Sequence, residues 1–224
     1  MSDDSFIREV DEELRSDRVQ DLWKNYGKLL IGGAVAVVLG TAGYRYYDYH
    51  SQQQAAQAGD AYMQAVRLAD EGKVDEAIAA FNELEADTSP VYKALSKLRS
   101  ASELAKQGNV KDAVAAYDAI AADGTAEQNL RSIARLRAGI LMVDEGSVAD
   151  VESRVGQLMG PGAPYRGSAK EALALAQYKA GDLAQSAKLF TEIKDDAGSP
   201  RALAQRALLM LDLIASEGGP AVTQ

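Results

Sequence analysis

The chain has 224 residues, a formal net charge of −9, 6% aromatic residues, 25% charged residues and no cysteine. This composition is typical of a folded helical protein and not of a disordered chain. The negative charge argues against nucleic acid as a ligand, and the lack of cysteine excludes disulfides, thiolate catalysis and cysteine-ligated metals.

The first 28 residues are predicted to form a cytoplasmic leader helix. Phe6, Val10 and Leu14 recur four residues apart among acidic and basic residues, a pattern typical of an amphipathic helix. This helix is either a solvated lead-in or a small docking face for a cytosolic or membrane partner.

Residues 29–47 are predicted to form a transmembrane helix. No charge occurs from Leu29 to Tyr44, and the 22 residues from Tyr26 to Tyr47 would extend about 33 Å as a helix, which spans a hydrocarbon core of about 30 Å. Aromatic and basic residues at both ends suit the headgroup region. The predicted membrane anchors are Trp23, Tyr26, Lys28, Tyr44, Arg45, Tyr46 and Tyr47.

Two alternatives to a membrane anchor are a buried core helix and a cleaved signal peptide. A helix with no polar face argues against the first. A leader of 28 residues with eight acidic side chains argues against the second.

The orientation of the span follows from basic residues near its ends. Four precede it within 14 residues, and only Arg45 follows it closely; the four are Arg15, Arg18, Lys24 and Lys28. This bias places the N-terminus in the cytoplasm and the C-terminal part across the membrane. In a bacterium that side would be the periplasm.

A juxtamembrane linker is predicted at 48–55, a repeat domain at 56–217 and a flexible tail at 218–224. Four glycines, spaced by 36, 38 and 35 residues, each separate two helical runs: Gly72, Gly108, Gly146 and Gly181. Glycine can take the positive φ that ends a helix. We therefore expect four helical hairpins with a glycine in each turn.

Three further positions repeat around each glycine, as expected if the helices of a hairpin approach closely. Seven residues before each glycine stands a small residue: Ala65, Ala101, Gly139 or Ala174. Five residues after each glycine stands a small or modest residue: Ala77, Ala113, Val151 or Ser186. Nine residues after each glycine stands a larger apolar residue expected to fill the space between hairpins: Phe81, Tyr117, Val155 or Phe190.

These positions, over residues 56–198, resemble the tetratricopeptide repeat. Gly160 to Gly167 is predicted to be an inserted loop, and Pro200 precedes a predicted capping helix with Leu211 at its small-residue position. The predicted fold is all-α: a single N-terminal transmembrane helix followed by a tetratricopeptide-like α-solenoid of about four helical hairpins plus a capping helix.

The whole layout is similar to the ancillary SecYEG translocon subunit family (YfgM-like). The residues that carry this resemblance are the approach Trp23–Lys28, the Gly- and Val-rich span that follows it and the aromatic exit Tyr44–Tyr47, of which the approach and the span are the distinctive parts. The resemblance implies a bacterial inner-membrane protein that associates with the Sec translocon and with periplasmic chaperones, including a membrane-anchored prolyl isomerase-like one.

The sequence has no motif that indicates catalysis. His50 is the only histidine, and there is no phosphate-binding loop, nucleophile elbow or zinc-binding HExxH. We therefore expect no enzyme activity, cofactor or metal, but a protein-interaction module that links the translocon to chaperones and newly secreted proteins and contacts lipid through one helix.

Two other functions stay open. One is an envelope stress or signalling regulator that sequesters a cytosolic response protein through the leader. The other is a structural scaffold of an envelope complex.

The first helix of each hairpin is expected to line the concave side of the solenoid, where an apolar groove would suit a protein segment. The alternative is that the same residues form core. The candidate groove residues are Tyr62, Val66, Leu95, Leu98, Ile133, Leu136, Ile140, Val143, Leu175 and Tyr178.

Overall fold

The computed structural model describes the backbone of residues 3–87 and 90–220, and side chains within 27–84 (except residue 30) and 91–220. Most of these residues are helical, and none of them forms a β-strand. The elements are α1 (Asp3–Asp70), α2 (Val74–Asp87), α3 (Pro90–Lys106), α4 (Val110–Ala122), α5 (Gln128–Glu145), α6 (Val148–Val155), the 3₁₀ helix η1 (Gly156–Leu158), α7 (Arg166–Lys179), α8 (Leu183–Lys194) and α9 (Arg201–Ser216).

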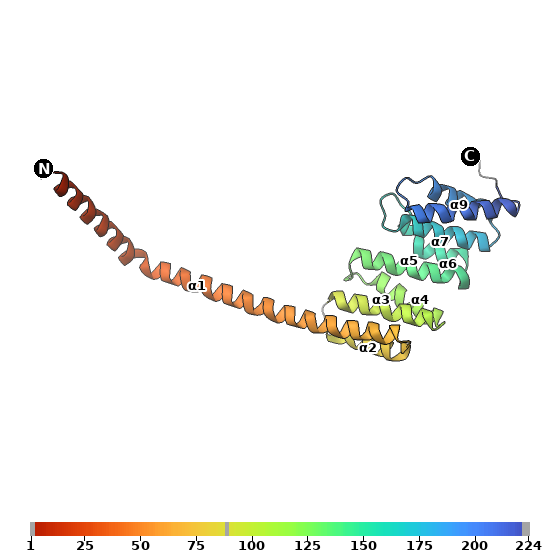
Figure 1. Cartoon of the computed structure of the whole chain (residues 1–224), viewed down its shortest axis with the longest axis horizontal. Helices are drawn as coiled ribbons and strands as arrows, with labels where there is room; N and C mark the ends of the chain where they lie inside the picture. The colour runs from red at the N-terminus through yellow and green to blue at the C-terminus, as the bar shows by residue number, and fades with distance from the viewer. Residues whose placement is uncertain (1–2, 88–89, 221–224) are drawn as a thin grey trace. The chain divides into compact units, whose positions relative to one another are not determined.

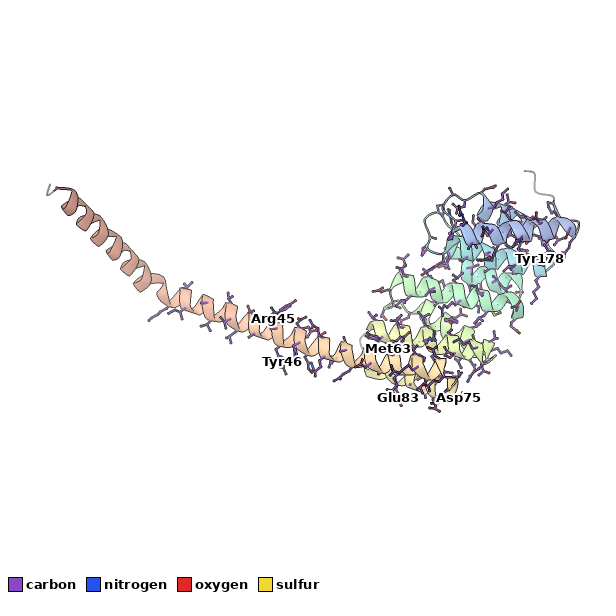
Figure 2. The ribbon with its side chains drawn as sticks, viewed as in Figure 1. Arg45, Tyr46, Met63, Asp75, Glu83 and Tyr178 are labelled. Atoms are coloured by element: carbon purple, nitrogen blue, oxygen red, sulfur yellow. The ribbon has the colours of Figure 1, made fainter. Side chains whose placement is uncertain are left out.

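The chain divides into two compact units, Met1–Ala56 and Gln57–Gln224. In the first unit the described residues form one helix, the N-terminal part of α1. The helix continues through 48–55, so the predicted linker is helical. Figure 2 shows Arg45 and Tyr46 projecting from this helix, and the Tyr46 ring stacks on His50 with ring centroids 6.4 Å apart.

The second unit is a stack of four antiparallel helical hairpins and one further helix. Residues 57–70 of α1 share a buried cluster with α2. The next hairpins are α3–α4, α5–α6 and α7–α8, with α9 packed on α8. Figure 1 shows these helices succeeding one another in chain order along the stack. The hairpin architecture predicted from the glycine spacing is therefore present.

Three of the four turn glycines have the predicted left-handed backbone. Gly72, Gly108 and Gly181 have φ values of 79°, 82° and 82°. The first turn shows the shared hydrogen bonding: Gly72 N donates to Ala69 O at 3.1 Å, and Lys73 N donates to Leu68 O at 2.9 Å. This is a Schellman motif, in which two amides satisfy carbonyls at the end of the helix.

Gly146 departs from this pattern, because its φ is −112° and its ψ is −177°. Glycine is favoured here for a steric reason and not for its φ: a Cβ at this position would overlap the Met142 side chain and approach Asp150. The next residue, Ser147, starts α6 with a capping box in which Ser147 and Asp150 satisfy each other's backbone amides. The prediction of a positive φ at Gly146 is wrong. This turn is closed by the Ser147 capping box and not by a left-handed glycine.

The repeated small and large residues are buried in every hairpin. All four large residues, Phe81, Tyr117, Val155 and Phe190, are at most 2% exposed. The residues five positions after each glycine are fully buried: Ala77, Ala113, Val151 and Ser186. The residues seven positions before each glycine are also buried: Ala65, Ala101, Gly139 and Ala174.

Two exceptions to the repeat pattern are compensated locally. A Cβ on Gly139 would overlap the Val155 side chain, so glycine makes room for a β-branched residue where the other hairpins have an aromatic ring. Ser186 replaces alanine, and its buried hydroxyl donates to Ala174 O at 2.8 Å. That hydrogen bond offsets the cost of burying a polar group.

Helix α9 covers the end of the stack, as the sequence predicted for a capping helix. Leu203, Ala207, Leu211 and Ile214 are buried in one cluster with Phe190 of α8. The predicted loop before α7 includes Tyr165 at φ 61° and Gly162 at φ 72°.

Replacing Ala101 with leucine should destabilise the repeat domain by about 1–3 kcal/mol. Ala101 has no exposed surface and belongs to a cluster with Tyr117 and Ile120, so extra methylene groups must displace well-packed neighbours. Chemical unfolding of residues 51–224, followed by helical circular dichroism, measures the change. The control is Ala115→Leu, which adds the same atoms at an exposed position of α4. Equal unfolding midpoints for the two variants would contradict the hairpin register.

Candidate protein-binding groove

The ten candidate groove residues fall into two groups. Leu98 and Leu136 are only 8% and 7% exposed and belong to core clusters. Tyr62 packs on Phe81 and Tyr92, with ring centroids 5.5 and 6.0 Å away. Val66, Leu95 and Ile133 are half-buried. For Leu98 and Leu136 the structure therefore shows the core alternative that the sequence left open.

The other four candidates line one groove between α5, α7 and α9. They are Ile140, Val143, Leu175 and Tyr178, and they stand six or three residues before the turn glycines of hairpins three and four. Leu209 and Met210 of α9 extend the apolar wall, and the hollow has a volume of about 710 Å³. Ile140 is 48% exposed, which is unusual for a large apolar side chain within a packed stack.

The polar residues at the groove are largely engaged within the protein. Arg206 of α9 binds Glu171 of α7 through two parallel bonds, Nε–Oε1 at 2.7 Å and Nη2–Oε2 at 2.8 Å. Lys179 donates to the carbonyl oxygens of Val143 and Asp144 at the end of α5, where a cation also suits the helix dipole. These contacts join α7 to α5 and to α9, the three helices that form the groove.

Tyr178 lies in the last turn of α7, where Figure 2 labels it, and it lines the groove. Its hydroxyl donates to Glu217 Oε1 at 2.7 Å, and this hydrogen bond raises the pKa of the phenol above its usual value. The hydrogen bond fixes the hydroxyl on Glu217, while the tyrosine lines the groove.

A second hollow, of about 420 Å³, adjoins the groove through Ile140. It lies between α3, α4 and α5, and its lining includes Ser102 and Ala105, which stand six and three residues before Gly108. Arg137 also lines it and contacts the Tyr117 hydroxyl at 3.4 Å. In hairpins two, three and four, the residues six and three positions before the turn glycine thus line a hollow.

Sequence reasoning missed the contribution of α9, since the helix was assigned only a capping role. The signal that could have revealed it is an excess of leucine: Leu208, Leu209 and Leu213 lie outside the buried stripe of α9 and are 45%, 69% and 41% exposed. A capping helix needs only one apolar stripe to cover the stack, so these three leucines are in excess of what that role requires.

The predicted membrane anchors are only partly described. Trp23 and Tyr26 lie outside the residues with described side chains. Lys28, Tyr44, Arg45 and Tyr46 are exposed, and Tyr47 is 74% exposed. Among the described residues, one helical stretch, Gly27–Asp70, is long and apolar enough to cross a membrane, and 6% of its most apolar window is buried. That exposure is unlike the core helix of a soluble domain.

The groove has no arrangement that indicates catalysis. Across the residues that the structure describes, no three histidine, cysteine, aspartate or glutamate side chains gather as a metal site would require. The groove offers apolar surface with a polar rim, which suits the binding of an apolar segment.

Comparisons with known proteins agree with this architecture. A family model described as a tetratricopeptide repeat-like domain matches residues 20–157, more than half of the chain. Neither the comparison with curated proteins nor that with solved structures gives a match. The fourth hairpin and α9 lie beyond the matched residues and continue the same packing. The chain thus belongs to the tetratricopeptide repeat-like domain family, whose stacked hairpins serve as protein–protein interaction modules.

Proposed function

We propose that this protein is anchored in the bacterial inner membrane by residues 29–47 and binds segments of other proteins on the periplasmic side. The observation that carries the proposal is the apolar groove of α5, α7 and α9, a hollow of about 710 Å³ in which Ile140 and Leu209 are exposed. Its family supports protein partners, and the uncharged stretch Leu29–Tyr44 supports the anchor.

The groove favours an extended or helical polypeptide over a small polar ligand. Its walls are mostly apolar, with Ile140, Leu175 and Leu209 contributed by three different helices. Such spacing admits several apolar side chains of one segment at once. Since the Arg206–Glu171 ion pair and the Lys179 contacts already fix α5, α7 and α9 relative to one another, little ordering is needed on binding.

The finer role that we propose is that of an accessory subunit of the Sec translocon, linking it to periplasmic chaperones and newly secreted proteins. The support is the resemblance of the approach Trp23–Lys28 and the exit Tyr44–Tyr47 to that family. Chains that emerge from a translocon are unfolded and expose apolar segments, which is the chemistry that the groove would recognise.

The N-terminus should lie in the cytoplasm and the repeat domain across the membrane, because four basic residues precede the span and one follows it. A reporter enzyme that is active only outside the cytoplasm, fused after Gln224, should be active. The same reporter fused after Lys28, before the span, should be inactive. Activity of the second fusion alone would reverse the topology. The intact chain should persist in membranes, whereas a shortened mature chain would indicate a cleaved signal peptide.

Replacing Ile140 and Leu175 with glutamine should weaken capture of partner segments at least about tenfold, because each apolar side chain covered by a ligand contributes roughly 1.5 kcal/mol or more. The measurement is photo-crosslinking in intact membranes from a photoreactive residue at Asp144, which lines the same groove. Identification of the trapped proteins tests the translocon and chaperone assignment at the same time.

The matched control is Val91→Gln, which changes an exposed apolar residue of α3 away from the groove. Helical circular dichroism must show that both variants are folded. Undiminished crosslinking in the folded Ile140 and Leu175 variant would exclude the groove as the binding site.

A further inference from the structure

The buried apolar clusters of the repeat domain join neighbouring members of the stack, with one exception. One cluster unites Ala101 of α3 and Tyr117 of α4 with Ala138 of α5, so it crosses from hairpin two to hairpin three. Two others cross from hairpin three to hairpin four and from hairpin four to α9. The cluster around Phe81 contains residues of α1 and α2 only, within the part of the chain that the structure describes. Among these residues, no buried apolar cluster spans the contact between hairpin one (α1–α2) and hairpin two (α3–α4), the first joint.

The face of α3 at the first joint is polar where the same face of later hairpins is apolar. Its residues twelve, eight and five positions before the turn glycine are Ser96, Ser100 and Glu103, and all three are buried. Ser100 Oγ lies 3.2 Å from Asn82 Oδ1 of α2, which places this face against hairpin one. At the same positions hairpins three and four have residues that belong to, or pack against, the clusters that cross between hairpins: Ala134, Ala138 and Leu141, and Ala169, Leu173 and Ala176. The first joint thus has polar side chains in place of an apolar contact.

Two buried polar atoms at the first joint have no hydrogen-bond partner among the described residues. They are Ser96 Oγ and Glu103 Oε2. The other carboxylate oxygen, Glu103 Oε1, contacts Arg99 Nε at 3.0 Å and Lys106 Nζ at 2.9 Å, and both cations lie on α3 itself. These two ion pairs do not require hairpin one, whereas water can reach the two unpaired atoms only when hairpin one moves away. Separation at this joint therefore recovers hydration that burial costs.

The side-chain contacts described across the first joint are polar and at least partly exposed, apart from one pair of rings. They are the Gln107–Asp75 and Ser100–Asn82 hydrogen bonds, at 2.7 and 3.2 Å, the Arg99–Asp70 ion pair, at 3.6 Å, and the Tyr92–Tyr62 ring contact, with centroids 6.0 Å apart. At the next joint Arg154 of hairpin three binds Asp118 of hairpin two through Nε and Nη2, in addition to the apolar cluster. Because exposed hydrogen bonds and ion pairs contribute little net stability, the first joint is held less strongly than the second.

We infer that the first joint opens transiently in the folded chain, so that hairpin one separates from hairpin two while hairpins two to four and α9 stay packed. Local opening of this kind occurs where few apolar contacts hold an element. Hairpin one takes its first helix from α1, which also contains the uncharged stretch Leu29–Tyr44. Opening therefore lets the groove-bearing hairpins move independently of hairpin one. The inference goes beyond segment binding and does not depend on it.

Single cysteines report on this opening in the full chain in detergent micelles, because the natural chain has none. Ser96→Cys and Ala134→Cys place a thiol at the same repeat position of the first and second joints, and neither native residue has exposed surface. With each rate divided by that of the urea-unfolded chain, Ser96→Cys should react with N-ethylmaleimide at least about tenfold faster than Ala134→Cys. Cysteine is larger than alanine, so any strain in the Ala134→Cys variant would work against this expectation. Equal rates would overturn the proposal.

The dependence on urea distinguishes opening of the joint from unfolding of the whole domain. Opening of one joint exposes little surface, so the reaction rate of Ser96→Cys should rise only slightly at low urea concentrations. The rate of Ala134→Cys should rise with the steep slope of global unfolding. The same steep slope in both variants would overturn the proposal, since Ser96 would then be reached only through global unfolding.

A joint made apolar should stay closed. Ser100→Ala with Glu103→Leu, in the Ser96→Cys background, copies the residues of hairpin three at these positions, and the labelling rate should fall at least about fivefold. Lys188→Leu, an exposed change on α8, is the control in the same background and should leave the rate unchanged. Helical circular dichroism must show that the variants are folded. An unchanged rate in the folded joint variant, or an equal fall in the control, would overturn the proposal.

Discussion

The repeat domain depends on the close packing of the two helices within each hairpin. Small residues at the contact allow the two helix backbones to approach each other. Ala65, Ala101 and Ala174 are fully buried at this contact, and Gly139 replaces alanine where Val155 comes closer still. A hairpin closed in this way still has an apolar outer side, so it is stable only when the next hairpin covers it. Ion pairs join neighbours about one repeat apart in sequence, as Arg154 Nη2 binds Asp118 Oδ2 at 2.7 Å.

The same packing decides where the protein can bind. Leu98 and Leu136, each ten residues before a turn glycine, are covered by neighbouring helices and buried in core clusters. Positions six and three residues before the glycine point away from those contacts and stay open in hairpins three and four. The groove is therefore a consequence of the stacking register, and its shape is fixed before any partner arrives. Such preorganisation lowers the entropy cost of binding.

The hairpin register could be predicted from the sequence, because a period near 36 residues places glycine, small and large residues at fixed positions. Which of the ten candidate groove residues are buried and which line the groove could not be predicted. Leu98 and Ile140 are both large apolar residues on the first helix of a hairpin, and only the position of the neighbouring hairpin decides which is covered. Gly146 was misjudged for a related reason: the signal for a cap, Ser147 followed by Asp150, competes with the signal for a glycine turn. The leucines of α9 were missed because a capping role explained one face of the helix and the other was not considered.

The central claim is that the groove of α5, α7 and α9 is occupied by protein segments when the chain is in its membrane. Hydrogen–deuterium exchange of the full chain in native membrane vesicles, compared with the purified chain in detergent, tests this directly. The claim predicts slower exchange in vesicles at the last turns of α5 and α7, with no change in α2 and α4. Equal exchange of α5 and α7 in both preparations, or protection confined to α2 and α4, would contradict it.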